Sequence, residues 1–224
     1  MNNNIINVAI DGPAGAGKST VARGAAKQLG YIYVDTGALY RAIGVNALRN
    51  GVDTKDKAAV AASLDGVKVN LVFLNGEQKV MLNGEDVSVE IRTPEASMAA
   101  SDVSAVPEVR AFLFDLQRDI AKRNSCIMDG RDIGTVVLPQ AQVKIFLTAS
   151  PEIRAERRYK ELIEKGSEVD YQSVLDDIVK RDYNDSHREI APLKPAEDSV
   201  LFDTTGLALD ESVAAITKII KEKI

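Results

Sequence analysis

The chain has 224 residues, of which 33 are acidic and 28 are basic, so its formal net charge is −5. This acidic balance argues against a protein that coats nucleic acid, because such proteins carry a surplus of basic residues. The chain has one cysteine, Cys126, which excludes an internal disulfide. It also has only one histidine, His187. One Cys and one His are too few for a Cys/His zinc cluster, which is therefore excluded.

Length and hydrophobicity bound the class of protein further. With 45% hydrophobic residues, the chain is long enough to bury a substantial core, and we expect a single domain over residues 1–224 with a small inserted lobe. No apolar run approaches the roughly 18 residues of a membrane span, and no signal peptide is recognisable. We therefore expect a cytoplasmic protein that binds neither membrane nor nucleic acid, and a monomer.

The first fifty residues alternate between apolar runs and helical patterns. Strands are predicted over residues 5–10 and 31–34, and helices over residues 21–29 and 37–50, with Gly30 ending the first helix. Alternation of this kind is typical of a parallel sheet that is covered by helices on both faces.

The middle of the chain has a different pattern. Residues 66–91 contain short alternating strand patterns, and two Asn-Gly pairs, Asn75-Gly76 and Asn83-Gly84, are strong turn signals. We interpret residues 63–92 as an inserted antiparallel β part within the domain.

Helical and strand patterns alternate again in the second half. Pro94 and Pro107 stand at predicted helix starts, and Ser150, Pro151 and Gly166 are start and stop signals for a helix over 150–166. Strands are predicted over 125–129, 143–149 and 199–204, and further helices over 171–187 and 209–223. The predicted fold class is α/β: a five-stranded, mostly parallel sheet with helices on both faces, a small antiparallel β insert, and a helical lid over residues 151–166.

A phosphate-binding loop follows the first predicted strand. The stretch GPAGAGKS, residues 12–19, matches GxxxxGK[ST] at every fixed position, with a strand before it and a helix after it. Backbone N–H groups of such a loop surround phosphate oxygens, and the next helix points its positive end at the same anion. Lys18 can bridge the β- and γ-phosphates, and the Ser19 hydroxyl can ligate Mg²⁺. The residues assigned to nucleotide binding are Gly12, Pro13, Ala14, Gly15, Ala16, Gly17, Lys18, Ser19 and Thr20.

This loop alone does not distinguish a kinase from a GTPase or a motor ATPase. A guanine-reading [NT]KxD motif is absent, since the stretch 54–57, TKDK, fails at its last position. A DxxG motif occurs only at 203–206, on the last strand, which is too late for a switch region. Both observations count against a GTPase.

A second group of polar residues follows the second strand. Thr36 is placed to cap the next helix, and its hydroxyl suits a second phosphate that Arg41 could also reach. A plain helix cap and a surface arginine would explain the stretch equally well.

The stretch DGRDIGT, residues 129–135, follows the third strand, and the carboxyl ends of parallel strands are where ligands bind in open α/β sheets. Arg131 could clamp a phosphate through two hydrogen bonds. Asp132 could accept a hydrogen bond from a base amino group, and Asp129 could help to place Mg²⁺ through water. We favour this functional interpretation over a decorative loop.

Arginines also occur at helical spacing further along the chain. Arg181, Asp185 and Arg188 are predicted to share one helical face, which an ordinary salt-bridged surface would also explain. The RAERR stretch, residues 154–158, is either a solvated face or a mobile lid that carries arginines over a phosphate site.

These stretches together resemble the bacterial cytidylate kinase family. The likeness runs from IDGPAGAGKST through DTGALYR, EIRT, MDGRDIGTVV, KIFLTASPEIRAERR and RDYNDSHREIAPLKPA to LFDTTG, essentially end to end. It implies transfer of the γ-phosphate of ATP to CMP or dCMP with Mg²⁺. The runner-up interpretations are a kinase with another acceptor, such as UMP, AMP or a small metabolite, and a nucleotide-binding module without activity.

The resemblance also implies roles for individual residues. The family often has Ser where this chain has Thr36, and the metal stays assigned to Ser19 and Asp129, as the loop and the strand end indicate. The implied catalytic residues are Lys18, Arg131, Arg157, Arg158 and Arg188. Those implied for the acceptor are Thr36, Arg41, Arg131 and Arg188 at its phosphate, Ser101, Arg110 and Asp132 at cytosine, and Arg181 and Asp185 at the sugar.

Overall fold

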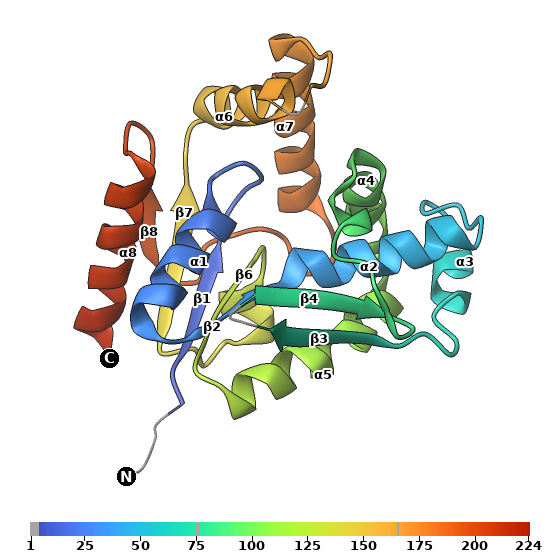
Figure 1. Ribbon diagram of the computed structural model, residues 1–224, viewed down its shortest axis with the longest axis horizontal. Coiled ribbons are helices and arrows are strands. Elements are labelled where there is room, and N and C mark those ends of the chain that lie inside the picture. The colour runs from blue at the N-terminus through green and yellow to red at the C-terminus, as the bar shows by residue number, and fades with distance from the viewer. Residues whose placement is uncertain (1–4, 75–76, 165) are drawn as a thin grey trace. The chain divides into compact units, whose positions relative to one another are not determined.

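The computed structural model describes residues 5–74, 77–164 and 166–224. The chain divides into two compact units, which are labelled by element in Figure 1. One, here called the phosphate-loop unit, comprises Ile6–Tyr31 and Cys126–Ile224, and the other, the insert unit, consists chiefly of Ile32–Ser125.

The larger sheet has five strands in the order β2-β6-β1-β7-β8. These strands are β1 (Asn7–Asp11), β2 (Ile32–Asp35), β6 (Cys126–Gly130), β7 (Val143–Thr148) and β8 (Val200–Asp203). Within the phosphate-loop unit, β1 pairs in parallel with β6 and β7, and β7 pairs in parallel with β8. The predicted five-stranded α/β sheet is confirmed, and β1 is its central strand, with two strands on each side.

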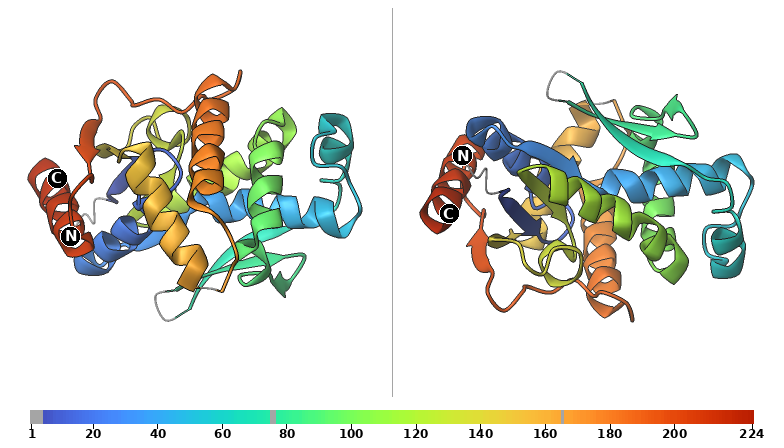
Figure 2. Two further views of the ribbon diagram at one scale, coloured as in Figure 1. Left: turned by 90° about the horizontal axis from the view of Figure 1, so that it is seen from above. Right: turned by 90° about the horizontal axis from the view of Figure 1, so that it is seen from below.

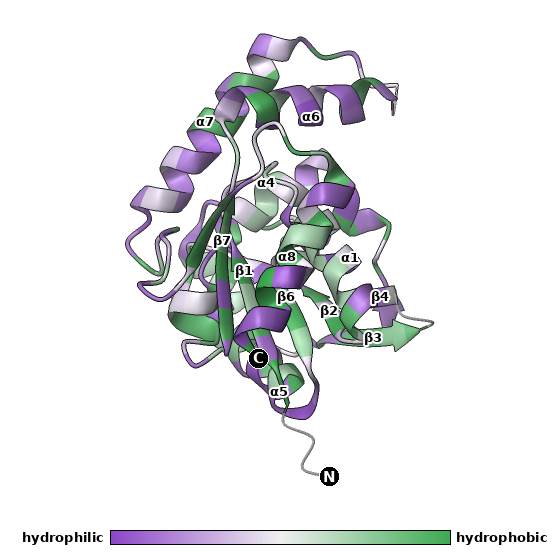
Figure 3. Cartoon of the chain, turned by 90° about the vertical axis from the view of Figure 1, so that its left-hand side faces the viewer, coloured by the Kyte–Doolittle hydropathy of each residue, from purple (hydrophilic) through white to green (hydrophobic). Residues whose placement is uncertain are grey.

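Within its described residues, the phosphate-loop unit has four α-helices. They are α1 (Lys18–Leu29), α6 (Pro151–Glu164), α7 (Tyr171–His187) and α8 (Leu209–Lys223), of which α1 packs against β1 and β6. A Cβ atom on Gly24 of α1 would lie 2.8 Å from the Val213 side chain of α8, so these helices pack closely. Helices α6 and α7 share a small core of Ala155, Val174 and Ile178. Figure 3 shows the strands as mostly hydrophobic and α6 as largely hydrophilic.

The insert unit combines helices with the smaller sheet. Its helices are α2 (Thr36–Arg49), α3 (Lys57–Ala62), α4 (Pro94–Val103) and α5 (Pro107–Arg123), with a 3-10 turn, η1 (Glu90–Arg92). Helices α2 and α4 pack tightly, since a Cβ on Gly44 would lie 2.8 Å from the Cβ of Ala99 (Figure 2). Pro94 and Pro107 begin α4 and α5 as predicted, whereas α3 has no counterpart among the predicted elements.

The smaller sheet is antiparallel, in the order β3-β4-β5, as predicted for the inserted β part. Its strands are β3 (Val69–Leu74), β4 (Glu77–Leu82) and β5 (Glu85–Asp86). Asn83 and Gly84 both have positive φ angles, 51° and 90°, which a tight hairpin turn requires. The other pair, Asn75-Gly76, lies outside the described residues.

Two helix boundaries differ from the predicted ones in ways that affect the site. Helix α1 begins at Lys18, because Gly17 is its N-cap, so Lys18 and Ser19 belong to the first helical turn. Helix α2 begins at Thr36, and Asp35 is its N-cap. Within the described part of the chain, no helix is long and apolar enough to cross a membrane.

Candidate functional site

The phosphate-binding loop connects β1 to α1 and requires glycine at its first position. Gly12 has φ 151°, and a Cβ added there would lie 1.9 Å from the carbonyl oxygen of Leu147 on β7. Gly17 has φ 85° and leads into the helix. The backbone therefore turns sharply against the sheet, and the positive end of α1 is directed at the loop.

Lys18 is buried and folds back over the loop. Its Nζ donates a hydrogen bond to the carbonyl of Pro13 at 2.6 Å. Burial, together with the nearby Arg131 guanidinium, lowers the pKa of Lys18 to about 7, although Asp129, Asp11 and Asp185 act in the opposite direction. An anionic ligand in the loop would favour the charged form of this lysine, as a phosphate-binding group requires.

Ser19 and Asp129 bring two oxygen groups together beside the loop. The Ser19 hydroxyl donates to Oδ2 of Asp129 at 2.7 Å, and Asp129 is the last but one residue of the buried strand β6. Among the described residues, no cluster of three or more His, Cys, Asp or Glu side chains could hold a metal ion by itself. A Ser–Asp pair fits Mg²⁺ in the way that this ion is usually held with nucleotides, by one or two protein oxygens and substrate phosphates.

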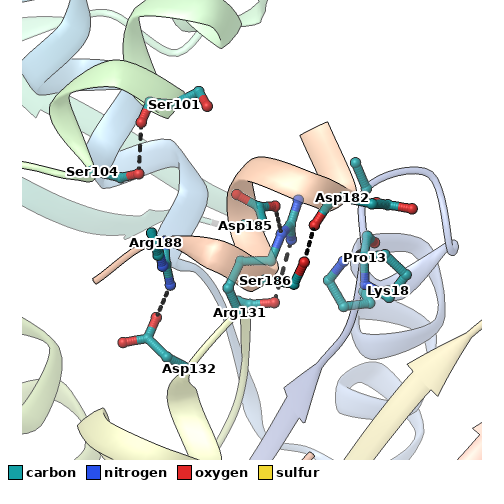
Figure 4. Close-up of polar contacts among 12 residues, drawn as sticks. Pro13, Lys18, Ser101, Ser104, Arg131, Asp132, Asp182, Asp185, Ser186 and Arg188 are labelled. Carbon is teal, nitrogen blue, oxygen red and sulfur yellow. Dashed lines mark hydrogen bonds and ion pairs between the residues drawn. The ribbon is translucent and has the colours of Figure 1, made fainter. Parts of the chain in front are cut away.

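The turn after β6 meets the C-terminal end of α7 through two ion pairs, which Figure 4 shows. Nε of Arg131 donates to Oδ2 of Asp185 at 2.8 Å, and Nη2 of Arg188 donates to Oδ1 of Asp132 at 3.3 Å. Burial by itself raises the pKa of Asp185, but Arg131, Arg188 and Arg181 outweigh it, so its net shift is downward. The structure therefore places Asp185 as an anion among three arginines.

The predicted common face of Arg181, Asp185 and Arg188 is wrong for Arg188. Helix α7 ends at His187, and Arg188 follows it in an extended conformation, φ −66° and ψ 143°. Nε of Arg188 donates to the carbonyl of Ala191 at 2.6 Å, so the chain after the helix holds this side chain. Because Arg188 lies outside the helix, its side chain can reach Asp132. The helical spacing of residues 181, 185 and 188 did not predict this contact.

The three arginines of the RAERR stretch occupy different environments. The Arg157 guanidinium donates to the hydroxyl and carbonyl of Thr204, at 3.1 and 2.9 Å, and lies 4.0 Å from the Cβ position of Gly17. Arg158 pairs with Glu161 on its own helix and is partly exposed. Arg154 is buried and donates to the carbonyl of Ala14 in the loop at 2.9 Å. Only Arg157 and Arg154 therefore lie against the phosphate loop.

In the insert unit, Asp35 and not Thr36 caps helix α2, so the predicted cap is wrong. The Asp35 carboxylate accepts from the Ala38 N–H at 3.0 Å, because Asp35 is extended whereas Thr36 already has helical geometry. The same carboxylate accepts from Nη2 of Arg41 at 2.7 Å. Nε of Arg41 is buried and meets no partner among the described residues, which leaves one donor for a ligand.

The remaining candidates of the insert unit lie on α4 and α5. Ser101 is half-buried on α4, and its carbonyl accepts from the Ser104 hydroxyl at 2.8 Å. Arg110 lies on α5, with its guanidinium carbon 5.9 Å from the centre of the Tyr40 ring. The predicted acceptor residues thus fall into two sets. Thr36, Arg41, Ser101 and Arg110 belong to the insert unit, and Arg131, Asp132, Arg181, Asp185 and Arg188 belong to the phosphate-loop unit.

Sequence reasoning missed three polar residues that organise these sets. They are Asp11, whose carboxylate holds the turn after β6, Asp182, which pairs with Arg154, and Gln78, whose side chain hydrogen-bonds both backbone groups of Asp35. For Asp11 the sequence did contain a signal, because an acidic residue directly after a buried apolar strand is expected to have a buried carboxylate. No signal was available for Asp182 or Gln78, because their partners are distant in the sequence.

Fold and loop define the class of P-loop kinases, and in this chain a cluster of arginines surrounds Asp185. The family model for cytidylate kinase matches residues 8–222, and the chain belongs to this family. A curated cytidylate kinase of Caldicellulosiruptor bescii is 50% identical and covers 98% of this chain and 99% of its own. That of Lactobacillus johnsonii is 52% identical and covers 99% of this chain and 96% of its own.

The similarity to solved structures concerns the fold alone. A protein of Eubacterium ventriosum, described as uncharacterized, matches with a TM-score of 0.53 at 13% identity. The match covers 96% of this chain and 98% of that one.

Proposed function

We propose that this protein transfers the γ-phosphate of ATP to CMP or dCMP, giving ADP and CDP or dCDP. The observation that carries the proposal is that Lys18, in an intact phosphate loop, lies close enough to the Arg131–Asp185 pair for both residues to act on its pKa. A donor-phosphate group and an arginine of the predicted acceptor site thus belong to one electrostatic cluster. Full-length relatives named cytidylate kinase support the same reaction.

The donor end would be formed by the phosphate loop. Backbone N–H groups of residues 14–20 would hold the phosphates, and Lys18 would move from the Pro13 carbonyl to the β- and γ-phosphates. Ser19 and Asp129 would hold Mg²⁺, which when bound shields phosphate charge. Arg157, tethered to Thr204 beside the loop, is the lid arginine that we assign to the transferred group.

The acceptor end needs no general base, because the attacking oxygen already belongs to an ionised phosphate. The main obstacle is repulsion between two polyanions whose reacting oxygens must be aligned. Arg131 and Arg188 are each paired with one carboxylate in the structure. Because a guanidinium has five N–H donors, each arginine could also donate to a phosphate. From the insert unit we assign Thr36 and Arg41 to the same phosphate, and Arg181 with Asp185 to the sugar.

Selection of cytosine is assigned to Asp132, with Ser101 and Arg110. A buried carboxylate accepts a hydrogen bond from the amino group of cytosine but repels the carbonyl that uracil carries at the same position. When no base is bound, the positive charge of Arg188 balances the negative charge of the Asp132 carboxylate.

The lid and the insert are assigned to closure. We propose that residues 151–166 act as the lid and residues 63–92 as part of the acceptor-nucleotide region, open without ligands and closed with both. Closure would exclude water, which otherwise accepts the phosphate. We further propose a cytoplasmic monomer as the active form.

The test is a steady-state assay of ADP formation from ATP and Mg²⁺ with CMP, dCMP, UMP or AMP as acceptor. We expect the highest kcat/KM with CMP or dCMP. Activity confined to UMP, AMP or another metabolite would identify a kinase with a different acceptor. ATP binding without ADP formation from any acceptor would identify a non-catalytic module and contradict the proposal.

A further inference from the structure

Asp11 is the last residue of the central strand and stands immediately before the phosphate loop. Its backbone is aligned with Gly130 of β6 on one side and with Phe146 of β7 on the other. Its side chain is buried, and its two carboxylate oxygens accept from the N–H groups of Ile133, at 2.8 Å, and Gly134, at 2.7 Å. One carboxylate therefore joins the start of the donor loop to the turn that follows β6.

The turn that Asp11 holds has an unusual geometry and carries Asp132. Residues Ile133–Val137 form a single π-helical turn, η2, with Val137 N–H donating to the Asp132 carbonyl at 3.2 Å. Such turns are rare and are frequently found at functional sites. The first N–H groups of any helical turn have no partner within it. Asp11 supplies the partner for two of them, directly beside Asp132.

The charge of Asp11 is what allows this double contact. Burial raises the pKa of Asp11 to about 6, while the two N–H donors and Lys18 act against that rise and Asp132 adds to it. The group is therefore an anion at neutral pH, with both oxygens as acceptors. An asparagine in the same place has one acceptor oxygen and one donor group, so it would oppose one of the two N–H groups.

We propose that Asp11 is a positioning residue for acceptor selection, acting through Asp132. Its carboxylate fixes the backbone of residues 133–134 to the strand that opens the phosphate loop, so the base-reading carboxylate and the donor loop share one rigid anchor. This inference rests on the proposed function, in which Asp132 reads cytosine. It assigns a role to a side chain that contacts no substrate.

The first experiment measures Asp11→Asn against the wild type with CMP and UMP as acceptors. We expect the KM for CMP to rise, and the ratio of kcat/KM for CMP to that for UMP to fall, by roughly tenfold to a hundredfold, the effect of one unsatisfied buried donor. The KM for ATP should change little. A role in stability alone would lower kcat with every acceptor equally and leave both KM values and the ratio unchanged, which would overturn the proposal.

A matched control is Asp56→Asn. Asp56 also accepts a backbone N–H, that of Ala59 at 3.0 Å, but at an exposed helix start in the insert unit. The same change of charge there should leave the acceptor ratio as in the wild type. A fall in the ratio as large as that of Asp11→Asn would contradict a local effect.

A second measurement is independent of activity. Amide hydrogen exchange at Ile133 and Gly134 in the free protein should be faster in Asp11→Asn, because these groups lose an acceptor. Unchanged exchange would overturn the proposal even if catalysis were impaired. If the wild type forms no ADP from CMP, the proposed function fails, whereas faster exchange would still show the anchor.

Gly134→Ala approaches the same contact from the other side, should Asp11→Asn fail to fold. A Cβ on Gly134 would lie 3.3 Å from Oδ2 of Asp11 and 3.2 Å from Cδ of Lys144, so the turn must shift by a few tenths of an ångström. We expect the acceptor ratio to fall in the same direction by a smaller factor. An unchanged ratio in a folded Gly134→Ala protein, with unchanged exchange at residue 133, would contradict the proposal.

Discussion

Arg154 and Asp182 form a two-bond ion pair between α6 and α7, with Nη1 and Nη2 of the arginine donating to the two carboxylate oxygens at 3.0 and 2.5 Å. The same guanidinium donates to the carbonyls of Ala14 and Ala149, at 2.9 Å each. Arg154 is 3% exposed, so its charge depends on these partners. One side chain thus joins both helices to the phosphate loop.

Removing Asp182 should therefore destabilise the protein strongly. Asp182→Ala leaves the buried Arg154 guanidinium without its anion, which costs about 3 kcal/mol of unfolding free energy, measured by urea denaturation. Glu156→Ala is the control, because it removes the exposed Lys160–Glu156 ion pair on α6, the helix that carries Arg154. Its denaturation midpoint should match that of the wild type. Equal midpoints for all three proteins would contradict the anchoring role of Arg154.

Nucleotide binding should take up a proton through Lys18. In the free protein its pKa is lowered to about 7 by burial, and a bound triphosphate raises it. The contribution of Lys18 to affinity is thus complete below about pH 7 and is lost as the pH rises through the pKa of the bound state. Calorimetry in buffers of different ionisation enthalpy should find about one proton taken up at about pH 8 and about none at about pH 6.

Lys18→Arg is the control for this titration, since a guanidinium stays charged throughout. The protons that the variant takes up belong to the nucleotide and are subtracted. If Lys18→Arg took up as many protons as the wild type at about pH 8, the proton would not be that of Lys18.

Asp129 should set the requirement for Mg²⁺. Asp129→Asn keeps an oxygen near the Ser19 hydroxyl but removes the negative charge that attracts a cation. We expect the half-saturating Mg²⁺ concentration to rise roughly tenfold, the effect of losing one charged contact. The control is Asp119→Asn, which changes an exposed carboxylate paired with Lys122 on α5. An unchanged Mg²⁺ requirement in Asp129→Asn would remove Asp129 from the metal site.

Asp132→Ala should lose much of the preference for CMP over UMP. The variant lacks the carboxylate that we assign to the cytosine amino group, and an unpaired buried partner costs roughly 1–3 kcal/mol. The ratio of kcat/KM for CMP to that for UMP should therefore fall by roughly tenfold to a hundredfold. If the variant kept full activity with CMP and full discrimination, cytosine would be read elsewhere.

The sequence by itself predicted those structural features that depend on residues close together in the chain. The contiguous stretch from Gly12 to Ser19 predicted the phosphate loop, since Gly12 and Gly17 are required by backbone geometry and Lys18 and Ser19 by chemistry. Asn83-Gly84 predicted its turn because both φ angles are positive, and alternation of strands and helices predicted the parallel sheet.

Only the tertiary structure decided which side chains meet across the chain. Asp11 contacts Ile133 and Gly134, and Arg154 contacts Asp182, over sequence separations that no pattern encodes. Arg188 reaches Asp132 because α7 ends at His187, the residue before it. The helical spacing of the sequence could not reveal where the helix ends. The physical reason is that strand register and helix packing bring these groups into a common buried environment, where each charge needs a partner.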